Sequence, residues 1–136
     1  MSNAQRSGGS VLHRRARSQL MMLTIQFLLG MGVNLIGLPS ENSGLAKAVT
    51  GALLGLHILV SLGLIVVAAL TIWRSGPLDP QSTNQAWVGG ILILISTVAG
   101  VLTTSVDSGW WSYLMAVGFI ASFVVYGNLL LRSRPA

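Results

Sequence analysis

The sequence predicts an all-α, polytopic membrane protein whose four transmembrane helices form an up-down bundle. Charged residues make up 8% of the 136-residue chain and hydrophobic residues 52%, whereas about a quarter of the residues are charged in a typical soluble protein. A water-soluble domain of this size could not cover its surface with so few charges. The sequence also contains four apolar runs, each close to or above the roughly 20 residues that an α-helix needs to cross a bilayer. We therefore expect the apolar residues to face lipid.

The first 18 residues are polar, small and basic, and they show no apolar periodicity. We expect residues 1–18 to form a mobile basic arm that ends at the membrane surface. The first apolar run follows at residues 19–38 and is ended by Pro39. A secretory signal has a shorter apolar core, of about 7–15 residues, followed by a small-x-small cleavage site. Leu38-Pro39-Ser40 is a poor cleavage site, so an uncleaved first span is favoured.

Three further apolar runs complete the transmembrane domain, which we place at residues 19–131. Their predicted helices cover residues 48–73, 86–104 and 111–131. The run at 48–73 would extend about 39 Å at 1.5 Å per residue, which exceeds a hydrocarbon core of roughly 30 Å. We expect this helix to tilt or to project beyond the lipid. Only helices and closed barrels satisfy their backbone in lipid, and the alternating pattern typical of a barrel is absent from the sequence.

The connections between the predicted spans are short and polar. They carry the Pro, Gly, Asn and Asp residues that are typical of turns, at residues 40–47, 74–85 and 105–110. Short connections make consecutive helices antiparallel neighbours, which predicts the up-down order. We expect turn or capping roles for the three acidic residues, which all lie in these connections: Glu41, Asp79 and Asp107.

Basic residues are distributed unequally between the two ends of the predicted bundle. Four precede the first span, one lies in the 74–85 connection and two lie in a short tail at 132–136, whereas Lys47 alone is on the opposite side. Because cytoplasmic segments of membrane proteins carry the excess of Lys and Arg, we expect a multi-pass plasma-membrane protein with both termini in the cytoplasm.

The composition argues against several classes of function. Cysteine is absent, which excludes disulfides, thiolate nucleophiles and iron–sulfur clusters. No Asp, Glu, Lys or Arg falls inside the predicted spans, which argues against an autonomous proton-coupled pump. No nucleophile–base pair, phosphate-binding loop or paired carboxylate is present, so we expect no enzymatic activity, metal or cofactor. The net charge of +5 lies beside the spans, where it indicates topology and gives no basic face for nucleic acid.

Polar side chains inside the first two spans form a candidate site. Gln26, Gly30 and Asn34 follow one another at intervals of four residues, and Ser61 lies one turn after His57. We expect Asn34 and His57 to form a hydrogen bond between the two helices. This polar cluster of Gln26, Asn34, His57 and Ser61 is either a helix-packing element or a binding site for a substrate or a lipid headgroup.

His57 is the one side chain within a predicted span that ordinarily titrates near neutral pH. A neutral imidazole that forms a hydrogen bond between helices explains its presence. Two functional alternatives stay open: a group that lines a polar path, and a haem or metal ligand. A single His is a poor zinc site, because zinc takes three or four protein ligands. A haem would need a second axial ligand, which a symmetric dimer would supply as a second His57.

Small residues at intervals of four predict close approach of helices. In addition to Gly30, these residues are Gly51 and Gly55 in the second span, Ser96 and Gly100 in the third, and Gly118 and Ser122 in the fourth. The pattern does not distinguish packing within the chain from packing between chains.

Two stretches resemble a known group of proteins. Residues 26–35 (QFLLGMGVNL) place a glutamine and an asparagine in the first helix, and residues 54–63 (LGLHILVSLG) place a histidine in the second. This arrangement is similar to uncharacterised four-helix membrane proteins of actinobacteria and related bacteria. The sequence departs from that group in its short first connection, which lacks histidine. The resemblance implies a small bacterial membrane protein and no particular activity.

The sequence thus favours a non-enzymatic membrane protein that is an accessory subunit or a self-associating bundle. Its expected partners are the lipid bilayer and another membrane protein or a second copy. The alternative is a small channel or carrier for a neutral solute along a path near His57. A haem-binding electron-transfer protein is a further alternative.

Overall fold

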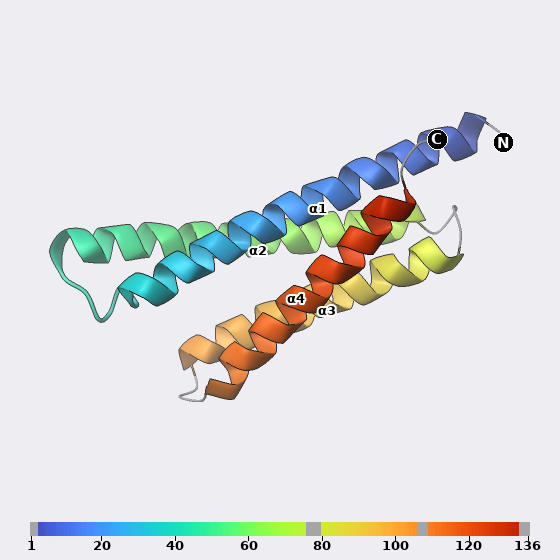
Figure 1. The fold of residues 1–136 in the computed structure, drawn as a ribbon. Helices are drawn as coiled ribbons and strands as arrows, with labels where there is room; N and C mark the ends of the chain where they lie inside the picture. Colours follow the sequence, from blue (N-terminus) through green and yellow to red (C-terminus); the bar gives the residue numbers. More distant parts are fainter. Residues whose placement is uncertain (1–2, 76–79, 106–108, 134–136) are drawn as a thin grey trace.

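The computed structural model describes residues 3–75, 80–105 and 109–133, with side chains from residue 9 onward. These residues form four α-helices: α1 (Asn3–Ile36), α2 (Gly44–Ser75), α3 (Pro80–Ser105) and α4 (Gly109–Arg132). Each helix is long and apolar enough to cross a membrane. The predicted fold class, four membrane-spanning helices in an up-down bundle, is confirmed (Figure 1).

The helices are arranged as two crossing hairpins (Figure 1). α1 packs along α2 and α3 packs along α4, while α2 contacts α3 and α1 contacts α4. The start of α1 and the end of α4 lie at the same end of the bundle, which we call the termini end; we call the opposite end the far end. The two hairpins lie together toward the termini end and separate toward the far end (Figure 1).

α1 begins much earlier than the sequence predicts, at Asn3. Residues 3–18 are therefore helical and continuous with the first span, which corrects the expectation of a mobile arm. The reason is that one face of this segment is buried, although its composition is basic. The buried face recurs at intervals of four, three and four residues and consists of Leu12, Ala16, Gln19 and Leu23. Three arginines of this segment consequently lie beside the packed part of the bundle: Arg14, Arg15 and Arg17.

The connection between α1 and α2 is held by its own side chains. Gly37 ends α1 with φ 93°, a left-handed conformation that favours glycine. The Glu41 carboxylate accepts a hydrogen bond of 2.9 Å from the backbone N–H of Leu38. Asn42 donates to the carbonyl oxygens of Ile36 and Leu38 at 3.1 and 2.9 Å. The turn role predicted for Glu41 is confirmed, whereas Asp79 and Asp107 lie outside the described residues.

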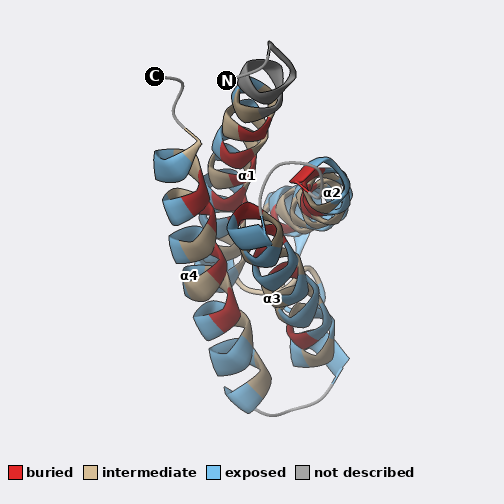
Figure 2. Cartoon of the chain, turned by 90° about the vertical axis from the view of Figure 1, so that its right-hand side faces the viewer, coloured by how far each residue is buried: buried red, intermediate tan, exposed pale blue. Residues whose placement is uncertain are grey.

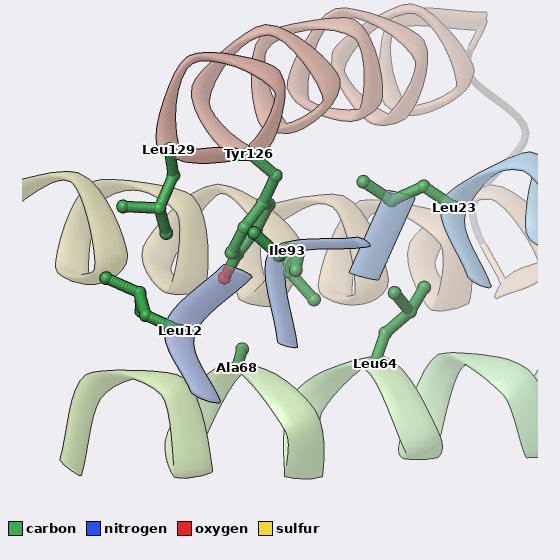
Figure 3. Close-up of a cluster of buried hydrophobic side chains, with 8 residues drawn as sticks. Leu12, Leu23, Leu64, Ala68, Ile93, Tyr126 and Leu129 are labelled. Carbon is green, nitrogen blue, oxygen red and sulfur yellow. The ribbon is translucent and has the colours of Figure 1, made fainter. Parts of the chain in front are cut away.

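The hydrophobic core lies toward the termini end, where side chains from all four helices meet (Figure 3). It consists of Leu12, Ala16, Leu23, Leu64, Ala68, Ile93, Tyr126 and Leu129. At its centre the Tyr126 ring lies against the backbone of Gly89. A Cβ atom on Gly89 would lie 2.8 Å from Tyr126 Cε2 and 2.9 Å from Cζ. Tyr126 is fully buried, so its ring has no free space into which it could move.

Most of the apolar surface of the helices is not covered by the chain itself. In the most apolar 18-residue stretch of each helix, only 11–22% of the residues are buried. The outward faces of the helices are largely exposed (Figure 2). Exposed aromatic side chains lie near both ends: Trp73 and Trp87 at the termini end, and Trp110 and Tyr113 at the far end. Aromatic residues at two levels separated by apolar surface are typical of a membrane-spanning protein.

We predict that Gly89→Ala destabilises the bundle by about 1–3 kcal/mol, because the added methyl group would overlap the buried Tyr126 ring. Gly127→Ala is the matched control, since a Cβ atom there meets nothing within 4 Å. Unfolding of both variants in mixed detergent micelles measures the difference. Equal stability of the two variants would contradict the packing described for Gly89.

Candidate functional site

Three of the four polar residues predicted for the site meet between α1 and α2. The side-chain amide nitrogen of Gln26 lies 2.9 Å from His57 Nε2 and donates a hydrogen bond of 2.5 Å to Ser61 Oγ. Ser61 Oγ in turn donates to the backbone carbonyl of His57 at 2.9 Å. We call Gln26, His57 and Ser61 the polar triad. It joins two antiparallel helices by side-chain hydrogen bonds within the apolar spans.

The hydrogen-bond pattern assigns the proton of the His57 ring. If the amide group of Gln26 donates to Nε2, then Nε2 accepts and the neutral imidazole carries its proton on Nδ1. His57 Nδ1 and Gln26 Oε1 are buried and have no hydrogen-bond partner in the structure. The triad therefore keeps one donor and one acceptor unused.

Gly30 provides the space in which the imidazole packs. A Cβ atom at this position would lie 3.1 Å from His57 Cε1, closer than an ordinary van der Waals contact. A side chain at residue 30 would therefore push the ring away from α1. Gly30 has the helix-packing role that its spacing indicates, and its partner is the imidazole.

Asn34 does not join the triad, which corrects the expected hydrogen bond with His57. Its side chain is exposed, and His57 is bonded to Gln26. The reason is helical geometry: eight residues make about 2.2 turns, so Asn34 is rotated by roughly 80° from the face that carries Gln26. Gly30 also lies directly against His57, which leaves Asn34 a full turn beyond the ring.

A second polar centre, which we did not predict from the sequence, lies at the crossing of the four helices. The Gln19 amide nitrogen donates to the backbone carbonyl of Leu64 at 3.2 Å, and its side chain lies beside the Tyr126 hydroxyl. Both side chains are fully buried. Although they are neighbours, neither Gln19 Oε1 nor Tyr126 Oη has a partner at hydrogen-bond distance and angle. A signal was present in the sequence, because Gln19 precedes Gln26 by seven residues and shares its helical face.

The small-residue pairs of α3 and α4 pack within the chain. A Cβ atom on Gly118 would overlap the Ser96 side chain, and one on Gly100 would lie 3.1 Å from Met115 Sδ. Ser122 is buried, and its hydroxyl donates to the carbonyl of Gly118 at 2.8 Å. These contacts explain the close approach of α3 and α4.

The small-residue pair of α2 behaves differently. Gly51 and Gly55 are exposed, and Cβ atoms at these positions would meet nothing within 4 Å. Ala48, which precedes the pair, and Ala52, which lies between its two glycines, are also exposed. The half of α2 toward the far end therefore presents a strip of small residues that no described residue covers.

The described residues include few side chains that commonly bind metals. No group of three or more His, Asp or Glu side chains that could hold a metal ion lies among the described residues. His57 Nε2 already interacts with Gln26, so a haem iron at this nitrogen would have to displace that bond. The other histidine, His13, lies 3.5 Å from Ser133 at the termini end, far along α1 from the triad.

No family model, curated protein or solved structure matches this chain.

We predict that Gln26→Leu destabilises the protein by about 1–2 kcal/mol, because it removes the two hydrogen bonds that Gln26 makes to His57 and Ser61 of α2. Asn34→Leu is the control, as it replaces an exposed amide of the same helix and should cost less than about 0.5 kcal/mol. A double-mutant cycle of Gln26→Leu with His57→Leu should give a coupling energy of about 0.5–2 kcal/mol. Additive effects of the two substitutions would show that the side chains do not interact.

Proposed function

We propose that this protein is a non-enzymatic membrane subunit that associates, through the far half of α2, with a second copy of itself. One observation carries the proposal. The small-residue pairs of α3 and α4 are filled by neighbours within the chain, whereas Gly51 and Gly55 face open space. In lipid, small residues allow helix backbones to approach closely, and van der Waals packing then drives association.

The shape of the bundle supports the same proposal. The hairpins separate toward the far end, so among the described helices this half of α2 lies beside α1 and away from α3 and α4 (Figure 1). Two copies related by a twofold axis would bring the two glycine strips face to face. Such an interface uses the same surface on both partners, as closed dimers do.

The orientation that we propose is the one expected from charge. Among the described side chains, Arg14, Arg15, Arg17, Arg74 and Arg132 lie toward the termini end and Lys47 lies at the far end. By the rule that cytoplasmic segments carry the excess of Lys and Arg, the termini would be cytoplasmic in a plasma membrane. The glycine strip would then lie in the outer half of the bilayer.

We predict that Gly51→Leu and Gly55→Leu each weaken self-association at least tenfold, because the added side chains hold the backbones apart. Ala69→Leu is the matched control, since Ala69 is an exposed small residue of the same helix outside the strip. Energy transfer between labelled copies in liposomes, measured over a range of protein-to-lipid ratios, reports the affinity.

A native protein that stays monomeric at every ratio would contradict self-association. Chemical cross-linking in native membranes then tests the other role. An amine-reactive cross-link from Lys47, which is exposed in the same half of α2, to a different membrane protein would identify the chain as an accessory subunit. The same two leucine substitutions should abolish that cross-link.

A second candidate function is passage of a small neutral solute along the polar triad. One observation favours it: Gln26 Oε1 and His57 Nδ1 are buried without partners, so an acceptor and a donor are available to a solute. Buried polar groups without partners are uncommon because each costs about 1–3 kcal/mol. Asn34, which is exposed, no longer belongs to this path.

For this candidate we predict that glycerol or urea enters liposomes that contain the native protein faster than protein-free liposomes. His57→Ala should reduce the rate, because it removes the donor from the path. Light scattering after rapid mixing measures the flux. If the native protein and His57→Ala both give only the flux of protein-free liposomes, the solute path is rejected. The self-association proposal does not depend on this result.

A further inference from the structure

The seam between α1 and α4 contains an apolar hollow. Its volume is about 240 Å³, and it is lined by Thr24 and Phe27 of α1 and by Phe119 and Phe123 of α4. Phe27 and Phe119 stack with their ring centroids 5.7 Å apart. The Thr24 hydroxyl donates to the carbonyl of Leu20 within its own helix at 2.9 Å, so the hollow offers hardly any polar group to a ligand. An alkyl chain suits such a lining.

The same seam is basic and polar at the termini end. Ser133 Oγ, directly after α4, lies 3.5 Å from His13 Nδ1 of α1. Arg17 follows His13 by one turn and precedes Thr24 by seven residues, so the three residues share one face of α1. Arg17 is exposed, as is Arg14 beside it, and neither forms an ion pair with any described residue.

The three acidic residues of the sequence offer no partner to Arg17 in the described structure. Glu41 lies in the connection at the far end, where its carboxylate accepts from the Leu38 N–H. Asp79 and Asp107 lie outside the described residues. Arg17 therefore has no acidic partner among the described residues, and it lies at the basic end of a membrane-spanning helix, a position that suits an anionic ligand.

The distances along the seam match one leaflet of a bilayer. Arg17 and Thr24 are separated by seven residues, or about 10 Å along the helix, and Ser133 and Phe123 by ten residues, or about 15 Å. Half of the hydrocarbon core is also about 15 Å. A charged group at Arg17 and an alkyl chain at the phenylalanines can therefore belong to one lipid molecule.

We propose that the α1–α4 seam binds an anionic phospholipid, with its phosphate at Arg17, His13 and Ser133 and one acyl chain in the phenylalanine-lined hollow. The Arg17 guanidinium donates to phosphate oxygens, and the His13 ring supplies a further donor. The Ser133 hydroxyl donates to the carbonyl of Leu130 at 3.3 Å and would turn from it toward the phosphate. The hollow is smaller than the roughly 300–1,000 Å³ of pockets that enclose compact ligands. It is open along the seam, which suits a chain that enters from the surrounding lipid.

A lipid in this seam would add a contact between the two hairpins. α1 and α4 belong to different hairpins and meet along this seam. The ligand would touch both helices on the side opposite to α2, so this site is separate from the glycine strip and does not depend on self-association.

The test uses the full-length protein purified in a mild detergent, with thermal stability measured as lipids are added. Phosphatidylglycerol should raise the melting temperature in a saturable way, whereas phosphatidylcholine of the same chain length and inorganic phosphate alone should not. Arg17→Gln should weaken the phosphatidylglycerol effect roughly fivefold, the loss expected for one arginine at an anionic lipid. Arg74→Gln is the matched control, because it removes an exposed arginine of α2 at the same end of the bundle as Arg17.

A second pair of variants tests the acyl-chain half of the site. Thr24→Trp would fill the hollow and should reduce phosphatidylglycerol binding while Arg17 remains, whereas Ile25→Trp adds the same bulk at the next, exposed position of α1. Equal responses to phosphatidylglycerol and phosphatidylcholine, or equal effects of Arg17→Gln and Arg74→Gln, would overturn the proposal. Stabilisation by inorganic phosphate alone would show that the seam binds a soluble anion and would also overturn it.

Discussion

The contact between Tyr126 and Gly89 lies where all four helices come together, and much of the architecture depends on it. Glycine at position 89 lets the tyrosine ring lie directly on the α3 backbone, so α4 approaches α3 closely while the ring reaches the core at the crossing (Figure 3). The hairpins are joined on this side of the bundle and separate beyond it. Their separation leaves the glycine strip of α2 uncovered, and one of the two seams that join the hairpins contains the phenylalanine-lined hollow.

Polar side chains in the spans fall into two groups with different physical roles. Most hydroxyl groups bond to a carbonyl of their own helix three or four residues earlier, as Thr71 and Thr97 do, and therefore say nothing about which helix lies beside them. Gln19 and Gln26 reach across to α2. Because an amide left without a partner is costly in an apolar environment, these two glutamines select one register of α1 against α2 from the many that apolar contacts alone would tolerate.

The number and order of the helices were predictable because they depend on apolar length, which is a local property of the sequence. The beginning of α1 was not, because only about one in four of residues 3–18 is apolar. Leu12 and Ala16 are nevertheless enough to bury one face of this segment among its arginines. Asn34 was misplaced because a stripe of residues at intervals of four drifts around a helix by about 40° at each step. The contrast between Gly55 and Gly118 was also beyond the sequence. Both belong to the same spacing pattern, and only the crossing of the hairpins decides which of them meets a neighbour.

The unequal lengths of the helices have a consequence for how the protein lies in lipid. α2 has 32 residues and α4 has 24, which correspond to about 48 and 36 Å. A single bilayer presents one thickness to both, so helices of such different length match it only by inclining to different degrees or by projecting into water. Two hairpins that lean by different amounts must cross. The crossing of the two hairpins (Figure 1) thus allows helices of different length to span the same bilayer.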